Sequence, residues 1–202
     1  LPASHGAVLV GILPLVTAAF AALRGKERPS PGFWLMAMIG SGLVIAFALR
    51  QSGGSFHPTD LMVLGAVVLG GLGYAEGGRL SSSMPGEQVI CWALVLSSPL
   101  LLPLVLWTSR DQLPVMAAAP LSAWLGFGYI SAFSMFIGFV FWYRGMALGG
   151  VARVGQVQLL QPFLTLVGAA LILGEALAPD HIAFAAGVIA VVAAGRRMRV
   201  AR

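Results

Sequence analysis

The chain has 202 residues, of which 58% are hydrophobic and only 9% charged, and its mean hydropathy is +0.91. A soluble domain carries roughly 25% charged residues. This composition therefore excludes an ordinary soluble protein and indicates a membrane protein, whose partner is the lipid bilayer. The net charge of +5 offers too few basic side chains for a nucleic-acid-binding face, and the single cysteine, Cys91, excludes an internal disulfide.

Seven apolar segments approach the roughly 20 residues that a membrane helix needs. They cover residues 6–23, 33–49, 61–81, 88–107, 121–142, 154–173 and 181–194. Prolines and glycines such as Pro29, Pro85, Gly150 and Pro179 interrupt the sequence between them. The predicted fold class is therefore all-α, a polytopic membrane helix bundle with about seven transmembrane helices.

Basic residues predict the orientation of these spans. One side of the membrane, the side that the first span reaches, receives ten of the twelve Lys and Arg residues. They are Arg24, Lys26, Arg28, Arg79, Arg144, Arg153, Arg196, Arg197, Arg199 and Arg202. The other side receives Arg50 and Arg110. Because cytoplasmic loops are enriched in Lys and Arg, we expect the first side, with the C-terminus, to be cytoplasmic.

An internal repeat relates the two ends of the chain at a constant offset of 148 residues (162 − 14, or 175 − 27). The matching pairs are Pro14 and Pro162, Thr17 and Thr165, Ala21 and Ala169, Ala22 and Ala170, Leu23 and Leu171, Glu27 and Glu175, and Pro31 and Pro179. Five expected spans separate equivalent points, so the two copies face opposite ways. This pattern is typical of an inverted-topology repeat, in which two orientations of similar energy allow alternating access.

Several stretches resemble one family of membrane proteins. The segment FWYRGMALGGVARVGQVQLLQPF at residues 141–163, followed by LGEAL at 173–177, resembles the second half of an EamA-like permease of the drug/metabolite transporter superfamily. The stretches YAEGGRL at 74–80 and VICWA at 89–93 are similar to parts of the same group. LPL at 13–15, with GKE at 25–27, resembles the matching end of the first half.

The resemblance implies ten helices arranged as two inverted five-helix repeats. Residues 1–50 then hold the last two helices of the first EamA repeat, and residues 57–202 hold the five helices of the second. We therefore expect a chain truncated at its N-terminus, without the first three spans. The implied function is a secondary active exporter of small organic metabolites or drugs across the bacterial inner membrane, with proton antiport as the energy source.

Two polar residues of the third span are candidates for the transport pathway or its gate. Glu76 lies well inside the span, where an unpaired charge costs about 3 kcal/mol. It can pair with Arg79, because residues three apart share a helix face, and so form an ion pair at the cytoplasmic mouth. It can also face a water-filled cavity and bind protons. The sequence leaves both interpretations open.

Glutamines and a proline gather in the sixth span. Gln158 and Gln161 are three residues apart and share a face, whereas Gln156 points elsewhere. Pro162 lacks an N–H, so we expect a helix kink that leaves the carbonyl of Gln158 without its helical donor, and Pro14 occupies the equivalent place in the first span. This polar group either lines the pathway or holds neighbouring helices together.

Other side chains are weaker candidates. Ser134 could line a substrate pocket or bond back to its own helix, and Trp92 could offer its indole N–H to a pocket. Trp142 and Tyr143 are expected to anchor the membrane interface. Four glycines of the third span are expected to let helices approach closely, namely Gly65, Gly70, Gly73 and Gly77. Glu27 and Glu175 are expected to cap loops or to pair with nearby charges.

Other functional classes remain to be weighed. Paired aspartates, a metal-binding His pair, an activated Ser and an ATP motif do not appear in the expected spans, which disfavours an intramembrane enzyme and predicts no metal or cofactor. The alternative function is a non-transporting membrane scaffold or an accessory subunit. Composition and spacing leave open the identity of the small-molecule substrate, import against export, and a monomer against a homodimer.

Overall fold

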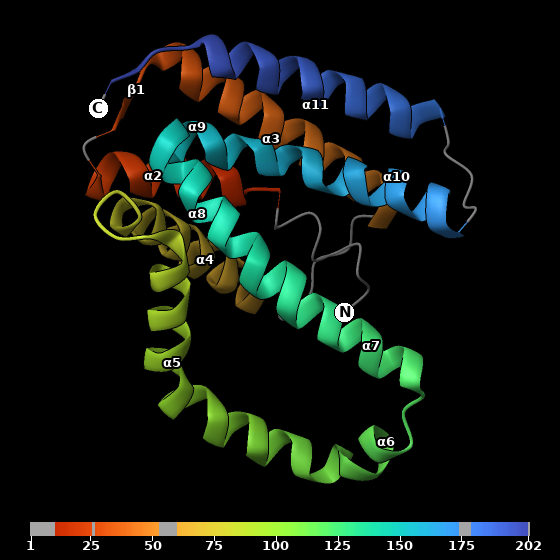
Figure 1. Cartoon of the computed structure of the whole chain (residues 1–202). Helices are drawn as coiled ribbons and strands as arrows, with labels where there is room; N and C mark the ends of the chain where they lie inside the picture. Colours follow the sequence, from red (N-terminus) through yellow and green to blue (C-terminus); the bar gives the residue numbers. More distant parts are fainter. Residues whose placement is uncertain (1–10, 26, 53–59, 174–178, 202) are drawn as a thin grey trace.

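The computed structural model describes residues 11–25, 27–52, 60–173 and 179–201 of the chain (Figure 1). Most of these residues are helical. The helices are α2 (Leu13–Arg24), α3 (Pro31–Ser52), α4 (Asp60–Leu80), α5 (Gly86–Ser109), α6 (Leu113–Ala117), α7 (Leu121–Tyr129), α8 (Gly138–Gly149), α9 (Val151–Gly155), α10 (Gln161–Leu173) and α11 (Pro179–Arg197). Shorter elements are the 3-10 helices η1 (Arg110–Gln112) and η3 (Gln156–Leu160), the π-helix η2 (Ile130–Ile137), and the strands β1 (Arg28–Pro29) and β2 (Val200–Ala201).

The predicted all-α class is confirmed. Within the described residues, three continuous helical stretches are long and apolar enough to cross a membrane, and they are Leu61–Leu80, Gly86–Ala117 and Leu121–Gly149. The apolar helices Leu13–Arg24 and Pro31–Phe47 are shorter. The third long stretch extends beyond its predicted end at residue 142 and stops at Gly150, whose φ of 92° favours glycine. The count of seven spans and the ten-helix arrangement stay predictions.

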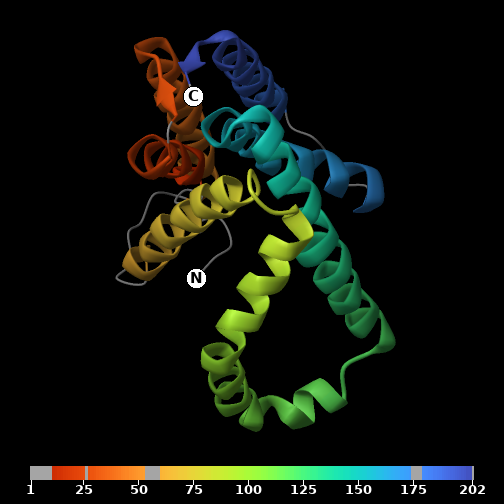
Figure 2. The ribbon, with the colours of Figure 1, turned by 60° about the vertical axis from the view of Figure 1, so that its left-hand side comes forward.

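Helices α3 and α11 lie side by side in both ribbon views (Figures 1 and 2). Strand β1 precedes α3 and pairs antiparallel with β2, which follows α11. The start of α3 therefore lies beside the end of α11, and the two helices run in opposite directions. They are also repeat-equivalent, because α3 begins at Pro31 and α11 at Pro179, an offset of 148 residues (179 − 31). Helices α2 and α10 begin at the same offset.

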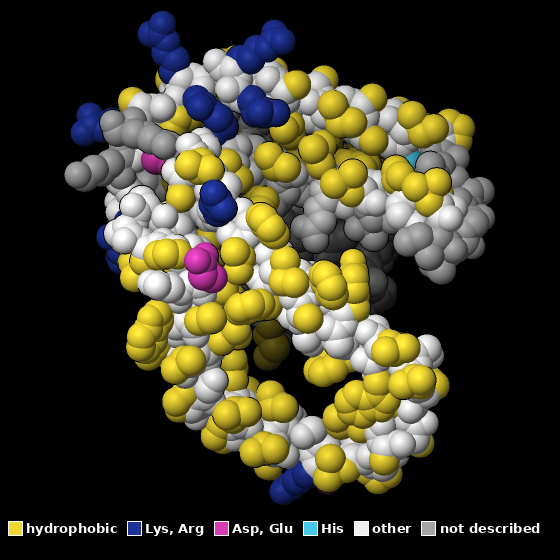
Figure 3. All heavy atoms as spheres, in the orientation of Figure 1, with side chains coloured by type: hydrophobic (Ala, Val, Ile, Leu, Met, Phe, Trp, Pro, Cys, Tyr) yellow, Lys and Arg dark blue, Asp and Glu magenta, His cyan; other side chains and the backbone are white. Residues whose placement is uncertain are grey.

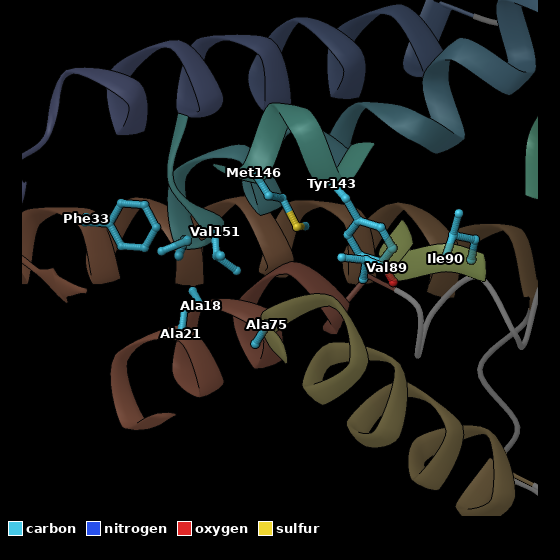
Figure 4. Close-up of a cluster of buried hydrophobic side chains, with 11 residues drawn as sticks. Ala18, Ala21, Phe33, Ala75, Val89, Ile90, Tyr143, Met146 and Val151 are labelled. Atoms are coloured by element: carbon cyan, nitrogen blue, oxygen red, sulfur yellow. The ribbon is translucent and has the colours of Figure 1, made fainter. Parts of the chain in front are cut away.

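The largest buried cluster joins residues from both ends of the chain. Ala18 and Ala21 of α2 and Ala75 of α4 pack with Met146 and Val151, which point toward them from α8 and α9 (Figure 4). Small residues make this close packing possible, because a larger side chain would hold the helix backbones apart. Burial here fixes how α2, α4, α8 and α9 meet.

Some glycines of α4 allow neighbouring helices to pack closely, but others for which the sequence predicted this do not. A Cβ atom on Gly77 would lie 2.3 Å from the ring of Tyr143, and one on Gly71 would lie 2.6 Å from the Val16 side chain. A Cβ atom on Gly65 or Gly73, by contrast, would have no atom of another described segment within 4 Å. Two of the expected contacts are therefore wrong, since neither Cβ position would meet a neighbouring helix among the described residues.

Residues 91–137 form an arm that leaves this packed body. In Figures 1 and 2, α5 runs outward, α6 turns at the tip, and α7 returns toward α8. The structure describes every residue of this arm, and none of them is buried. Its surface is rich in hydrophobic side chains (Figure 3). The prolines Pro99 and Pro103 lie inside α5, where each removes a backbone donor.

Substituting Gly71 should separate packing from helix propensity. We expect Gly71→Ala to lower the thermal-unfolding midpoint in detergent, because its new Cβ would meet Val16 and the backbone nitrogen of Thr17 at 3.1 Å. Overpacking costs about 1–3 kcal/mol. Gly73→Ala is the matched control on the same helix, where the gain in helix propensity of about 1 kcal/mol acts alone. Equal midpoints for both variants would contradict the packing described here.

Candidate functional site

Glu76 forms an ion bridge between two helices near one end of the body. Its carboxylate accepts a hydrogen bond from Nε of Arg24, the last residue of α2, and one of 2.9 Å from Nε of Arg79. Nη2 of Arg79 lies 2.6 Å from Oε2 of Glu76. The pair expected from the spacing of Glu76 and Arg79 is present, and the structure adds Arg24 from a different span. One carboxylate thus serves two guanidinium groups.

A cavity of about 410 Å³ adjoins this ion bridge. Its polar side is formed by Arg24, Arg79, Glu27 and Ser82. Its apolar walls come from Ala21, Gly25, Ala75, Gly78, Met146, Ala147 and Val151. Ligand pockets commonly enclose about 300–1,000 Å³ and combine apolar walls with a few polar groups. The cavity therefore has the size and the lining of a small-molecule site, and it lies where α2, α4, α8 and α9 meet.

Glu27 fixes one wall of the cavity. Its two carboxylate oxygens accept hydrogen bonds from the backbone N–H groups of Val151 at 2.7 Å and Ala152 at 2.9 Å. These N–H groups open α9 and have no partner within the helix, and a negative charge there is also favoured by the helix dipole. The expected capping role of Glu27 is present. Its repeat counterpart, Glu175, lies outside the described residues.

A second polar group lies where α4, α8 and η3 meet. The side chain of Gln158 lies close to the hydroxyl group of Tyr74. The Tyr74 ring packs edge-on against Trp142, with 5.9 Å between the ring centroids. Within the described residues, Oε1 of Gln158 and Nε1 of Trp142 are buried and have no hydrogen-bond partner. An unpaired acceptor and an unpaired donor are costly in an apolar setting, and a bound molecule could satisfy both.

Gln156 connects the two copies of the repeat. It is buried, with 5% of its surface exposed, and its Nε2 donates a hydrogen bond of 3.3 Å to the backbone carbonyl of Pro14. Pro14 is the second residue of α2, and Gln156 begins η3 just before α10. This bond explains how the amide of Gln156 is satisfied in a buried position, on a different helix face from Gln158.

The helix kinks expected at Pro14 and Pro162 stay predictions, and residues 1–10, which precede the first described helix, lie outside the described residues. Each proline is the second residue of its helix, where its missing N–H costs nothing. Before Pro162 the chain is a 3-10 helix, and the carbonyl of Gln158 accepts a hydrogen bond from the backbone N–H of Gln161. The freed carbonyl expected at Gln158 therefore has a donor, because the tighter winding replaces the bond that proline removes.

The remaining sequence candidates are scattered. Gln161 is exposed on the first turn of α10, and Ser134 is exposed within η2 on the arm. Trp92 is 57% exposed on α5 and lines a separate hollow of about 270 Å³ with Glu87, Gln88, Cys91 and Val95. The structure brings together Glu76 with Arg79, but it does not bring Ser134 or Trp92 to the ion bridge or to Gln158.

Three contributing residues were missed or misjudged in the sequence. Arg24 looked like a basic residue that orients a span, and nothing in the spacing indicated a partner in α4. Tyr143 was expected at the membrane interface, but it is 6% exposed and packs against Gly77. The anchor expected at Tyr143 is therefore wrong, whereas Trp142 is half-buried with its indole nitrogen enclosed, and its anchoring role stays a prediction. Aromatic residues at a span end give the same signal whether they point inward or outward.

Comparisons with known proteins agree with one another. The description "EamA-like transporter family" belongs to the family model that matches residues 57–194. A protein of Bacillus subtilis (strain 168) named "Uncharacterized transporter YdeK" is 51% identical over 194 residues, which are 96% of this chain and 67% of that protein. A "Probable terminal-alkyne amino-acid exporter" of Streptantibioticus cattleyicolor is 30% identical over 198 residues, 94% of this chain and 62% of that protein. No solved structure matches the chain.

Removing the Glu27 carboxylate should destabilise the body. We expect Glu27→Ala to lower the thermal-unfolding midpoint, because two buried N–H groups lose their acceptors at about 1–3 kcal/mol each. Glu27→Asp keeps the charge but is one methylene shorter, so its midpoint should also fall. Glu27→Gln keeps one acceptor oxygen, so its midpoint should lie between those of Glu27→Ala and the unaltered chain. Glu87→Ala removes an exposed carboxylate in the first turn of α5 and serves as the control. A Glu27→Ala midpoint equal to that of the unaltered chain would refute the capping role.

Proposed function

The chain belongs to the EamA-like transporter family of membrane proteins, and we propose from this premise that it is the larger part of a secondary active exporter of small organic molecules. It spans about two thirds of the length of the curated relatives it matches, 67% and 62%. The intact transporter would carry its substrate by alternating access across the bacterial inner membrane. The relative named as an amino-acid exporter supports amino acids and similar metabolites as the substrate class.

The packing of α3 against α11 carries this proposal. These two helices occupy equivalent places in the repeat and run antiparallel. A two-fold axis lying in the membrane plane relates equivalent helices in this way. With such symmetry, each tilt of one half against the other has a counterpart, related by the two-fold rotation, that opens the opposite side of the membrane. The antiparallel pair supports inverted repeats, and inverted repeats support alternating access.

We infer that the ion bridge acts as a gate. In the proposed two-repeat arrangement, Arg24 belongs to the first repeat, and its partner Glu76 belongs to the second together with Arg79. A tilt between the repeats would lengthen the Arg24–Glu76 contact and leave the Arg79–Glu76 contact unchanged. Basic side chains gather over the ends of α2, α3, α9 and α11 (Figure 3), and the positive-inside rule then assigns this mouth to the cytoplasm.

Tyr74, Trp142 and Gln158 are the proposed lining of the pathway beyond this mouth. Their helices come from the second repeat, and Gln156 ties the same region to α2 of the first. The unpaired donor on Trp142 and acceptor on Gln158 suit a substrate that offers both an acceptor and a donor, as an amino acid does. Aromatic rings beside them suit an apolar side chain or an ammonium group.

The intact parent and this chain should differ in transport. We expect proteoliposomes with the full-length parent to move radiolabelled amino acids down an imposed gradient, and proteoliposomes with the 202-residue chain alone to show background flux. The reason is that a gate between two repeats needs both complete. Flux through the chain alone at the rate of the parent would contradict the two-repeat mechanism. Absence of flux through the parent for every small metabolite tested would favour the scaffold or accessory role.

Glu76 is the proposed carboxylate for proton coupling. In the full-length parent, we expect Glu76→Gln to abolish the dependence of flux on an imposed pH gradient, because the amide cannot exchange a proton. Glu87→Gln, at an exposed carboxylate of α5, should keep that dependence. The measurement is initial flux at several pH gradients with a constant substrate gradient. Unchanged pH-driven flux in Glu76→Gln would rule out this role and leave Glu76 as an ion-pair gate.

A further inference from the structure

We propose that one corner of the body binds the phosphate group of an anionic phospholipid, whose acyl chains then lie along α3 and α11. Four exposed arginines form this corner, which we call the basic patch, and they are Arg28, Arg196, Arg197 and Arg199. The inference goes beyond the proposed function, because it concerns the lipid around the protein and holds whether or not the chain carries a substrate.

The strand pair β1–β2 brings these arginines together from distant parts of the sequence. Arg28 lies opposite Ala201, and the backbone N–H of Ser30 donates a hydrogen bond of 3.0 Å to the carbonyl of Arg199. Side chains two residues apart on a strand share a face, so this register places Arg28 and Arg199 on the same face of the pair. The last turn of α11, directly before the pair, carries the other two arginines of the basic patch. Basic side chains gather at this end of the body in Figure 3.

The basic patch carries an excess of positive charge. The ion pairs found among the described residues involve none of its arginines. The carboxylate nearest in sequence, Glu27, accepts hydrogen bonds from the N–H groups of Val151 and Ala152, and counting its full charge still leaves an excess of three (4 − 1). Arg153 of α9 adds a further charge, since its Nη2 donates to the carbonyl of Met198 at 3.0 Å. Phosphate suits this corner, because its oxygens match the planar donor fork of a guanidinium.

Apolar surface begins directly beside the basic patch, which favours a lipid over a soluble anion. Leu35, Met38 and Ile39 are exposed in the first three turns of α3, and Ile189 is exposed on the neighbouring α11. Such apolar helices face acyl chains in a bilayer, so arginines at their ends lie at the level of the headgroups. Clusters of roughly four to eight basic residues next to a membrane helix are typical of anionic-lipid binding. An anionic phospholipid matches both surfaces, with its head on the patch and its tails on α3 and α11.

Competition between two lipids for the chain tests the proposal. The chain in neutral detergent is mixed with equal amounts of phosphatidylglycerol and phosphatidylcholine that have the same acyl chains, and bound lipid is counted by native mass spectrometry. We expect phosphatidylglycerol to be preferred at least about tenfold, since each arginine near a membrane surface contributes about fivefold. The preference should fall as salt is raised, because salt screens exposed charges. Equal binding of both lipids at low salt would overturn the proposal.

Variants assign the lipid to the basic patch. We expect Arg196→Gln combined with Arg199→Gln to lower the preference at least about fivefold, and Arg196→Lys with Arg199→Lys to keep most of it, because the charge remains. Arg144→Gln is the matched control, since it removes an exposed arginine of α8 outside the strand pair. An equal loss in Arg144→Gln would show a diffuse effect of net charge and contradict a site. If the double glutamine variant does not fold, Arg28→Gln alone should lower the preference, and an unchanged preference there would also contradict it.

Glycerol 1-phosphate separates a lipid from a soluble anion. It carries a phosphate group without acyl chains, so we expect it to leave phosphatidylglycerol bound when both are present at equal concentration. Displacement of the lipid by an equal amount of glycerol 1-phosphate would make the patch a site for soluble phosphates, and the proposal would be wrong. The outcome does not depend on flux, so a transporter without any lipid preference would refute this inference and leave the proposed function standing.

Discussion

The contact between the Glu27 carboxylate and the start of α9 is the interaction on which the packing of α2 against α9 depends. It joins the loop after α2 to residues more than a hundred positions later in the chain. Helix α9 continues through η3 into α10, so anchoring its first turn also places Gln156 against Pro14 and Gln158 against Tyr74. Val151 and Ala152 are buried within the body, so their backbone N–H groups need an acceptor from the protein, and the Glu27 carboxylate supplies it.

In the proposed transporter, the two polar groups of the body would have different roles. At the mouth, three charged side chains bridge α2 and α4, and deeper in the body, uncharged groups on Tyr74, Trp142 and Gln158 meet within aromatic surroundings. Charge is kept where water can reach it, since the arginines are more than half exposed (58% and 53%). The deeper group carries only dipoles, whose burial costs less than that of ions. A molecule that passes both must first meet charge and then lose water.

The sequence predicted the helical class and the partnership of Glu76 with Arg79, because each depends on periodicity or on spacing along one helix. The repeat even placed the starts of α2 and α10, and of α3 and α11, in register. Contacts between distant spans were not predictable in this way. Arg24 against Glu76, and Gln156 against Pro14, depend on which faces meet, and apolar helices present similar sequence on every face. The carbonyl of Gln158 was expected to lack a donor because the 3-10 winding before Pro162 was not predicted from the sequence.

The π-helix η2 has a consequence for how the long span of residues 121–149 should be read. Each residue of a π-helix advances by a smaller rotation than in an α-helix, since the hydrogen bonds close five residues apart. A helical wheel drawn from Leu121 at α-helical spacing therefore drifts out of phase after Ile130. Such a wheel would place Trp124, before η2, and Trp142, after it, on one face, but the π-helix rotates one part of the span relative to the other. The lipid-facing side must therefore be assigned separately for each part.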